Sequence, residues 1–583
     1  MSPDGITIHL IVEELNSELQ QSRVDRVYQP EQLEIILSLR KPGQSLRLLL
    51  SAHAENARLH LTSQEKTNPP SPPTFCFVLR KYLEGSRLLD IRQVDLDRVV
   101  YFTFSRLSES GGYQEVHLIS EIMGKHSNLI LVDPQTGQII DAVKRYSHAV
   151  SRYREVLPGR IYIPPPLQSK VSPLDLDEER FVQVLQDGNW ELKLKDLVFK
   201  HLAGIGPDLA RELMFRANLP ADLLMEDCGE YELRSLWQAL QKTISPLLRG
   251  ECEPTLVFDG KKPLGYTPYL PTMYQPLSLT AAPSLNAAAD TFYTSRTEMA
   301  RFEQLQNSLA GIVRREATRV DKKLWLQQQA QSEAVKSQDY RIKGEMLLAH
   351  LHLLERGQTM AHLPNLYEPE APPLEIALDP SLTPSQNAQR LFRRYERSRN
   401  TLKTNQLRMA QTLEEQAYLA SVRTALDLAE TSEELQEIRV ELEEAGFVKV
   451  KAKERKGKPQ KKTPLQVSKI PAAENFEILI GKNNRQNDYL TMHLAKKEDL
   501  WLHAREIPGA HVIIRSQPGR EIPASALEQA ARLAAYYSEA RTSSKVPVDY
   551  TARKNVWKPA KARPGFVLYE NYQTILVNPE APE

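Results

Sequence analysis

The chain has 583 residues, of which 41% are hydrophobic and 26% charged, so its composition is that of an ordinary globular protein. This length predicts about three to five domains. Its 75 Lys and Arg residues balance 74 Asp and Glu residues, and its three cysteines lie far apart. The cysteine count excludes a disulfide-stapled fold and a Cys-based zinc ribbon, and no apolar run is long enough to cross a membrane.

The first 285 residues predict two domains. Residues 1–170 predict a mixed α/β domain, because helical apolar spacing at 6–19 is followed by strand-like runs around 33–39, 46–50, 58–62, 99–104, 115–122 and 128–131, with a short helix at 75–83. Residues 171–285 predict a helix-hairpin-helix domain with helices at 194–202 and 208–217, a further helix at 232–244 stopped by Pro246, and an irregular return segment from 254.

Residues 286–448 predict a coiled coil. The stretch 294–355 reads as one long helix whose apolar residues are three and four apart, at Phe302, Leu305, Leu309 and Ile312, then Val313, Ala317, Val320 and Leu324. After a Pro-rich break at 364–384, a second arm at 385–429 carries Leu391, Tyr395, Leu402, Met409 and Leu413. Two arms joined by such a break predict an antiparallel hairpin. The alternative is a bundle packed on the globular body.

The C-terminal part predicts a basic linker at 449–474 and an α+β domain at 475–583, with strands near 476–480, 500–502, 511–514, 565–569 and 574–577 and a helix at 525–539. Residues 449–563 carry 24 basic and 11 acidic residues, a net charge of +13, so the neutral total hides a strongly basic region. The fold class is therefore an α+β multidomain chain: an N-terminal mixed α/β domain with a helix-hairpin-helix, a long antiparallel coiled coil and a C-terminal α+β domain.

Two N-terminal motifs are candidate nucleic-acid contacts. In the first, Asp97-Arg98 accompanies Glu121-Ile122-Met123-Gly124-Lys125-His126-Ser127-Asn128 at a strand end. Arg98, Lys125 and His126 suit phosphate, Ser127 and Asn128 suit ribose or base edges, and Asp97 would orient Arg98 or accept a bond from the nucleotide. In the second, Gly204 and Gly206 form a turn whose amides would face a phosphate backbone. The structural alternatives are a strand-end turn with local ion pairs and a plain helix–helix connection.

Two C-terminal strings mix cations, amides and aromatic residues, as contact with an RNA backbone and its bases requires. The first contains Lys482, Asn483, Asn484, Arg485, Trp501, His503 and Arg505, and the second contains Arg553, Lys554 and Lys558. The alternative for each is a solvated loop, with Trp501 in the core. His493, His503 and His511 lack matching carboxylates or cysteines, so neither a metal nor a cofactor is expected, and no motif for nucleotide hydrolysis or a covalent nucleophile is present.

Taken in order, these motifs resemble the NFACT family of ribosome-associated quality control factors, in its bacterial RqcH-type and eukaryotic NEMF branches. The resemblance covers nearly the whole chain. Its most specific carriers are the string 121–128 and Asp499-Leu-Trp-Leu-His-Ala-Arg505, on either side of the coiled coil. Further carriers are Asp4-Gly5, Leu48–His53, Phe75–Gly85 and Asp97-Arg98.

The resemblance implies a cytoplasmic, ribosome-associated protein without catalytic residues of its own. It would bind large ribosomal subunits (23S rRNA) obstructed by peptidyl-tRNA and recruit alanyl-tRNA for an untemplated alanine tail, a mark for degradation, with a small RNA-binding helper protein as a further partner. Residues 97, 98 and 121–128 would bind tRNA, with Asp97, Arg98, Glu121, Ile122 and Met123 carried over from bacterial relatives. The glycine turn and the C-terminal strings would contact RNA backbone.

Two other functions stay open at this point. A surface fibronectin-binding adhesin is a label often attached to bacterial relatives, but the N-terminus lacks the pattern of a secretory signal. A DNA glycosylase of the formamidopyrimidine type is suggested by the N-terminal domain and the helix-hairpin-helix. However, Ser2 precedes Pro3, which therefore has no free amine, and three scattered cysteines do not make a four-cysteine zinc finger.

Overall fold

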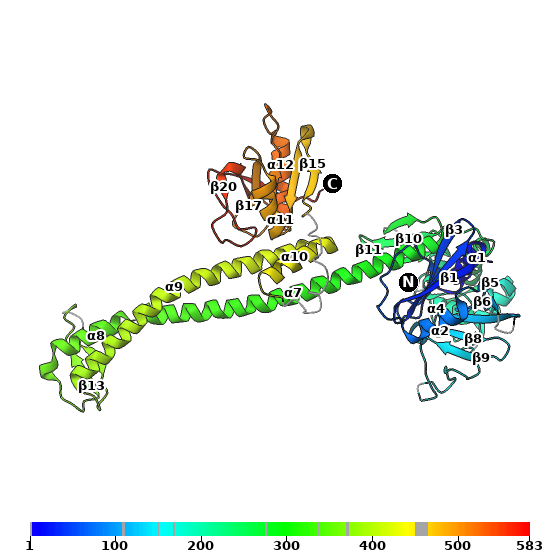
Figure 1. Cartoon of the computed structure of the whole chain (residues 1–583), viewed down its shortest axis with the longest axis horizontal. Coiled ribbons are helices and arrows are strands. Elements are labelled where there is room, and N and C mark those ends of the chain that lie inside the picture. Colours follow the sequence, from blue (N-terminus) through cyan, green and yellow to red (C-terminus); the bar gives the residue numbers. More distant parts are fainter. Residues whose placement is uncertain are drawn as a thin grey trace. The chain divides into compact units, whose positions relative to one another are not determined.

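The computed structural model describes residues 3–107, 111–149, 151–166, 169–274, 277–335, 337–368, 372–448 and 465–582 (Figure 1). It divides into two compact units, residues 1–300 and 301–583. Helices and several antiparallel sheets make up both units, so the α+β multidomain class is confirmed. Most of the predicted basic linker, residues 449–464, lies outside the described residues. None of the described helices has the length and apolar character that crossing a membrane requires.

A nine-stranded antiparallel sheet is the frame of the first unit, in the order β4-β3-β2-β1-β5-β6-β7-β8-β9. The strands are β1 (Arg23–Glu31), β2 (Glu34–Lys41), β3 (Gln44–Ser51), β4 (Arg58–Leu61), β5 (Arg87–Gln93), β6 (Val99–Leu107), β7 (Tyr113–Glu121), β8 (Asn128–Asp133) and β9 (Gln138–Ala142). Helix α1 (Gly5–Leu19) is capped by Asp4, whose side chain accepts the Thr7 N–H, and helix α2 is Thr74–Leu83. The predicted strands omitted β1, β5 and β9. The solvated faces of β1 and β5 carry many charges, which hides their apolar alternation.

A helical region follows: α3 (Glu178–Gln186), α4 (Leu194–His201), α5 (Pro207–Arg216) and α6 (Glu230–Leu248). Helix α6 continues past Pro246, so the predicted stop there is wrong. Pro246 lies in the last turn, where little helix remains to be disrupted. The predicted irregular segment is also wrong in part, because β10 (Thr255–Asp259), β11 (Lys262–Thr267) and β12 (Ser278–Ala281) form a three-stranded antiparallel sheet.

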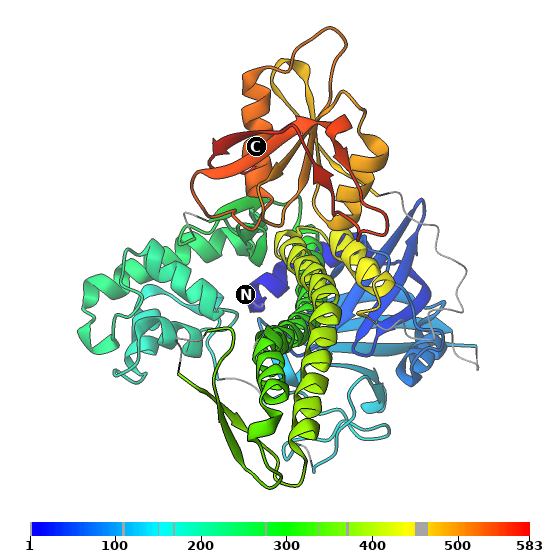
Figure 2. The same ribbon diagram turned by 90° about the vertical axis from the view of Figure 1, so that its left-hand side faces the viewer.

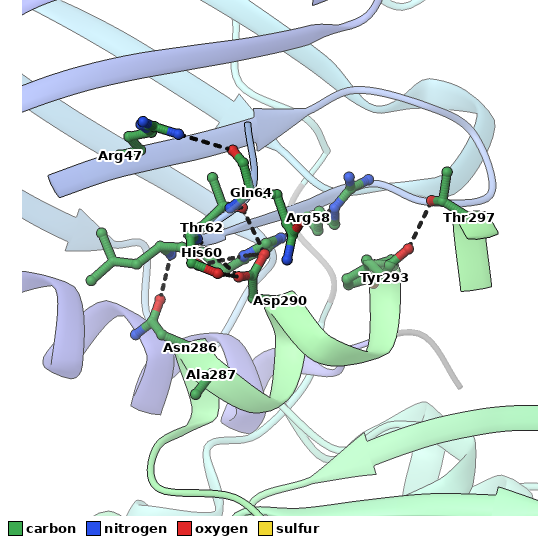
Figure 3. A network of polar contacts seen from close by, with 12 residues as sticks. Arg47, Arg58, His60, Thr62, Gln64, Asn286, Ala287, Asp290, Tyr293 and Thr297 are labelled. Atoms are coloured by element: carbon green, nitrogen blue, oxygen red, sulfur yellow. Dashed lines mark hydrogen bonds and ion pairs between the residues drawn. The ribbon is translucent and has the colours of Figure 1, made fainter. Parts of the chain in front are cut away.

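The long helix α7 (Leu285–Val335) is anchored to the first unit at its start (Figure 3). Asn286 accepts the Leu61 N–H at 2.9 Å, and Asp290 accepts the Thr62 hydroxyl at 2.6 Å. The Arg58 guanidinium lies 4.5 Å from the Tyr293 ring centroid. Since these contacts join the first helical turns to β4, the unit boundary at residue 300 falls inside the predicted coiled-coil domain.

In the second unit, α7 and α9 (Pro384–Leu428) form an antiparallel pair. Lys323 meets Glu415 at 3.3 Å, and Gln306 donates to the Leu426 carbonyl at 2.7 Å. The predicted hairpin is therefore confirmed, and its seam buries Leu309, Val313, Val320, Leu419 and Val422.

The prediction that Leu413 lies in the coiled-coil seam is wrong. Leu413 is 48% exposed, whereas Thr412 is fully buried. The three-four spacing continues from Met409 to Thr412, so Leu413 lies one position outside the seam. Asn405 lies within the seam and donates to the Gln327 carbonyl at 2.6 Å, a polar contact of the kind that fixes register.

The tip of the hairpin is a small structure of its own. The predicted first arm is divided, because α8 (Gln338–Ala349) follows α7 as a separate helix. Strands β13 (Met360–Leu363) and β14 (Leu374–Ala377) pair across the Pro-rich segment. A core that includes Leu347, Ile376 and Ala388 joins them to the start of α9.

The C-terminal domain is a six-stranded antiparallel sheet in the order β15-β16-β18-β17-β19-β22 (Figure 2, orange to red). Its strands are β15 (Ser468–Pro471), β16 (Glu477–Gly481), β17 (Leu500–Ala504), β18 (His511–Ile514), β19 (Val546–Ala552) and β22 (Gln573–Val577). Helix α12 (Ala524–Tyr536) packs its alanines into the core of this sheet. Helix α11 (Asn484–Tyr489) follows β16, and β20 (Val556–Trp557) pairs with β21 (Leu568–Tyr569).

Candidate nucleic-acid interface

The turn between β5 and β6 carries Asp97 and Arg98. The Gln93 side chain donates to the Asp97 carbonyl at 2.8 Å and to the Gly5 carbonyl at 2.9 Å, which ties the turn to α1. The Asp97 carboxylate accepts the Arg98 backbone N–H at 2.7 Å. Both side chains are partly exposed, and neither makes an ion pair within the described residues. The predicted alternative of local ion pairs therefore does not hold there, and the Arg98 guanidinium is available to an anion.

The second half of this motif begins beside the turn, since the Ile122 N–H donates to the Arg98 carbonyl at 2.9 Å. Glu121 is fully buried and forms a two-pronged ion pair with Arg154, at 2.7 and 2.6 Å. The Tyr162 hydroxyl donates to the same carboxylate at 2.9 Å. Ile122 lies in the main core. Direct contact of Glu121 or Ile122 with RNA is thus contradicted by their burial, and their place is under the surface that carries Arg98.

The rest of the string divides into buried and exposed residues. The Ser127 hydroxyl accepts the Met123 N–H at 2.8 Å, and the Asn128 amide donates to the Lys144 carbonyl at 2.9 Å. Both side chains are fully buried, so the prediction that they meet ribose or base edges is wrong in geometry. Met123 is partly buried against the neighbouring core. Gly124, Lys125 and His126 form an exposed 3-10 turn in which Gly124 has a φ of 56°.

The glycine turn of the helix-hairpin-helix faces inward. The Gly206 N–H donates to the Asp4 carboxylate at 3.3 Å, and the Gly204 carbonyl accepts the Ile6 N–H at 3.1 Å. A Cβ on Gly5 would lie 1.9 Å from the Leu96 carbonyl oxygen, so only glycine permits this approach. Burial raises the pKa of Asp4. The Gly206 amide is therefore bonded to Asp4 and does not face a phosphate backbone, and the glycine turn joins the hairpin to α1 and to the 94–98 turn.

Side chains of the first C-terminal string contact a row of glutamates that lies on α10 (Ser432–Glu444) and just before it. The Lys482 ammonium lies 3.0 Å from Glu430 and 3.4 Å from Glu434. Burial disfavours this charge, but Glu434 and Glu430 outweigh that effect and raise the pKa of Lys482.

The neighbouring amides extend the same contact. Asn483 donates to Glu437 at 2.7 Å, and Asn484 donates to Glu441 at 2.9 Å. Burial raises the pKa of Glu441 to about 7. Arg485 is partly exposed. Direct RNA contact by Lys482, Asn483 and Asn484 is thus contradicted by their placement, because these side chains dock the domain on the base of the hairpin.

Trp501 is fully buried, so it is not placed to stack on a base, and the core alternative is confirmed. Its ring centroid lies 5.7 Å from that of His503 and 4.8 Å from that of Tyr569. Burial lowers the pKa of His503 to about 4. Arg505 lies 3.7 Å from the buried Asp549 and donates to the Tyr572 hydroxyl at 3.0 Å. The side chains of His503 and Arg505 therefore contact other residues of the sheet, and each is only partly exposed.

The second C-terminal string leaves more of its side chains free. Arg553 donates to the Val556 carbonyl at 3.2 Å, and Lys558 lies 2.7 Å from Asp488. Lys554 is exposed, as is Lys561. Near them in sequence, Trp557 on β20 is 44% exposed and Phe566 is 49% exposed. We call Lys554, Trp557, Lys561 and Phe566 the C-terminal basic-aromatic face; its residue types are those that bind an RNA backbone and stack on bases.

Comparison with known proteins agrees with this arrangement. Residues 4–461 match the model of the NFACT N-terminal and middle domains, and residues 467–571 match the NFACT protein RNA binding domain. The chain belongs to the NFACT family. A relative of this NFACT protein is the Rqc2 homolog RqcH of Bacillus subtilis, which is 34% identical over 586 residues, 100% of this chain and 98% of the relative.

Solved structures are similar to parts of this NFACT protein. The N-terminal part of the fibronectin/fibrinogen-binding protein from Streptococcus suis is 32% identical, covers 50% of this chain and 98% of its own, and has a TM-score of 0.42. The MutM (Fpg) protein from Thermus thermophilus is 17% identical, covers 43% of this chain and 77% of its own, and has a TM-score of 0.23. Neither likeness carries a functional argument for an adhesin or for a glycosylase.

Sequence reasoning missed which tryptophan of this NFACT protein is exposed. Trp501 and Trp557 both stand among cations and amides in the sequence. A usable signal existed, because Leu500-Trp501-Leu502 is a continuous apolar run, which is typical of a strand buried on both faces. Trp557 instead follows a polar stretch and lies on a two-residue strand.

Proposed function

We propose that this protein acts in ribosome-associated quality control: it binds large ribosomal subunits obstructed by peptidyl-tRNA and recruits alanyl-tRNA for an untemplated alanine tail. The observation that carries the proposal is the match to the Rqc2 homolog RqcH, which extends over 100% of this chain. The protein then works in the cytoplasm on 23S rRNA and tRNA, together with a small RNA-binding helper protein. Peptide-bond formation stays with the ribosome, so the chain itself contributes binding and positioning.

In this proposal the first unit holds tRNA through the turn 97–98 and the neighbouring turn 124–126. Arg98 supplies a cation that makes no ion pair among the described residues, and Lys125 and His126 are exposed in the turn that follows Ile122, whose N–H donates to the Arg98 carbonyl. A charge-assisted hydrogen bond to phosphate is the contact that such groups offer. Buried Glu121, with Arg154, holds the end of β7, which leads into the 124–126 turn and pairs with the start of β6, directly after the 97–98 turn. Glu121 is thus a positioning residue for the tRNA surface.

The second unit is proposed to bind the large subunit. The α7–α9 hairpin is long enough to reach across an RNA surface, since α9 alone has 45 residues, about 68 Å at 1.5 Å per residue. The C-terminal basic-aromatic face adds exposed cations and rings. Its match to an RNA binding domain supports contact with rRNA. Binding through such cations is expected to weaken steeply with salt.

The test is the double variant Asp97→Ala with Arg98→Ala. We expect a loss of co-purifying tRNA of about 10- to 100-fold, which is the equivalent of one charge-assisted hydrogen bond. Alanine tailing should fall with it. Co-sedimentation with large subunits should persist, because the second unit is unchanged. The matched control is Arg87→Ala with Asp90→Ala, which removes two exposed residues of the same charges from strand β5, just before the turn.

The melting temperature of each preparation separates binding from folding. If the 97–98 variant melts earlier and loses tRNA and subunits together, the turn is structural and the assignment of the tRNA site is wrong. If the wild-type protein sediments with no ribosomal particle even at low salt, the ribosomal function itself is wrong.

A further inference from the structure

A lysine and an exposed aromatic ring lie together at the end of α4. The Lys170 ammonium donates to the Phe199 carbonyl at 2.7 Å and lies 4.6 Å from the centroid of the Phe199 ring. Phe199 is 37% exposed, and its neighbour Lys200 is exposed as well. Both contacts hold the lysine in place over the ring, so the pair is a fixed feature of the surface.

Backbone contacts place this pair next to the turn that carries Arg98. The Val171 N–H donates to the His201 carbonyl at 2.8 Å, and the Ala203 N–H donates to the Val171 carbonyl at 2.8 Å. One residue further, Gly204 packs on Leu96: a Cβ there would lie 3.0 Å from the Leu96 side chain. The segment 170–171, the end of α4 and the turn 94–98 therefore lie side by side in the fold.

Electrostatics agree with this proximity. The pKa of Lys170 is lowered, first by burial and then by the Arg98 charge, while Asp97 opposes the change. The end of a helix carries partial negative charge on its free carbonyls, which repels an anion. The positive charge of Lys170 offsets this partial negative charge at the Phe199 carbonyl. The surface is thus positive although it lies at a helix C-terminus.

Two cations beside an exposed ring match the chemistry of a nucleotide. A base stacks on an aromatic face, and its phosphate takes the charge-assisted bonds. An apolar protein partner would need a wider apolar patch, but Phe199 is flanked by Lys170 and Lys200. The charge of the surface therefore favours a polyanion with unpaired bases.

We propose that Phe199 stacks on an unpaired base of the recruited tRNA, while Lys170 and Arg98 contact the adjacent phosphate. This inference rests on the proposed tRNA recruitment and adds a subsite on the helical region to it. The helix-hairpin-helix then contributes to RNA binding through the end of α4, and its glycine turn serves only to hold the region against the Asp97-Arg98 turn.

The experiment measures binding of purified deacylated tRNA to the full-length protein by filter binding. We expect Phe199→Ala to weaken binding by about 5- to 100-fold, the range for loss of one base–aromatic stack. Phe199→Tyr keeps the ring and should restore binding. Lys170→Gln should weaken binding and flatten its salt dependence, since one phosphate contact is lost. The matched control is Phe215→Ala, which removes another exposed ring (55% exposed) from the same helical region.

Each outcome separates this subsite from the proposed function. If Phe199→Ala binds tRNA as the wild type does while Asp97→Ala with Arg98→Ala does not, the subsite is overturned and the function stands. If Phe199→Ala also lowers the melting temperature and subunit co-sedimentation, the ring is structural and the subsite is overturned. If the wild-type protein itself fails to bind tRNA, both the subsite and the recruitment of tRNA are overturned.

Discussion

Two polar turns of this molecule look alike in sequence and differ in what their side chains do. The turn at 97–98 leaves the Arg98 guanidinium without an ion pair among the described residues. In the string from Lys482, the lysine ammonium pairs with Glu430 and Glu434. The Asn483 and Asn484 amides donate to Glu437 and Glu441. The first carries a cation that we propose to contact tRNA. The second is a docking element within the second unit.

This difference shows that the acidic residues nearest in space decide whether the cations of a basic string can bind a ligand. The glutamates that meet Lys482 come about 50 residues earlier in the chain, at a distance no local pattern reveals. Glu434, Glu437 and Glu441 are three and four apart and share one side of α10, and Glu430 lies just before that helix. In this chain the acidic row is the place where the string from Lys482 docks.

The largest expected effect breaks the buried support under the N-terminal turn. Glu121→Ala removes one partner of an ion pair whose side chains are 0% and 7% exposed. Such a loss leaves Arg154 buried without its partner and costs about 3–5 kcal/mol of unfolding free energy. Urea unfolding of the full chain checks this. The control Arg160→Ala removes an arginine that is 65% exposed from its ion pair with Glu155, and because solvent screens that arginine the loss should cost under about 1 kcal/mol. An equal cost for both variants would contradict the distinction between support and surface.

A second prediction concerns pH at the docking element. The folded protein raises the pKa of Glu441 from 4.5 to about 7 by burial. Between these values the folded state binds more protons than the unfolded state, so the stability of this contact falls as pH rises from 4.5 to 7. Glu441→Gln keeps the acceptor for Asn484 without the charge and should remove that fall, on the order of 1–3 kcal/mol.

The measurement is hydrogen exchange of α10 and α11 as a function of pH. The control is Glu433→Gln, an exposed glutamate on the same helix that should leave the profile unchanged. Protection of α11 in wild type that stays level from pH 5 to 8, once intrinsic exchange rates are allowed for, would show that Glu441 is ionised without cost.

The smallest expected effect compares two exposed lysines with a lysine that pairs with glutamates. Lys554→Gln with Lys561→Gln should flatten the salt dependence of large-subunit binding by about one unit of slope per lost phosphate contact. Lys482→Gln should leave that slope unchanged, because its ammonium is neutralised by glutamates. Co-sedimentation over a range of salt concentrations measures both. A flatter slope for Lys482→Gln alone would reverse the roles of the two strings.

The candidate site was predictable in part. The turn at 97–98 and the exposed residues 124–126 follow from a strand-end pattern with glycine and cations. The burial of Glu121, Ser127 and Asn128 did not follow, because a polar residue is buried only when partners complete its hydrogen bonds. Arg154 and Tyr162, which complete those of Glu121, lie 33 and 41 residues further along the chain.

The sequence by itself determined the local elements. Three-four spacing predicted the coiled-coil arms, and the second arm was expected from 385, one residue after α9 begins. Alternating apolar residues placed about half of the described strands, since a half-buried strand exposes every second side chain, and the central strand β19 was among those not predicted. These signals depend on neighbours within a few residues, which is why they can be recognised from the sequence alone.

Tertiary structure alone decided which polar groups are free. Trp501 became core and Trp557 became surface because one lies on a central strand and the other on a two-residue strand. Lys482 became a docking residue because two glutamate carboxylates lie within 3.4 Å of its ammonium, whereas Arg98 makes no ion pair among the described residues. Coulomb energies and desolvation depend on distances in space, and the fold sets those distances between residues far apart in sequence.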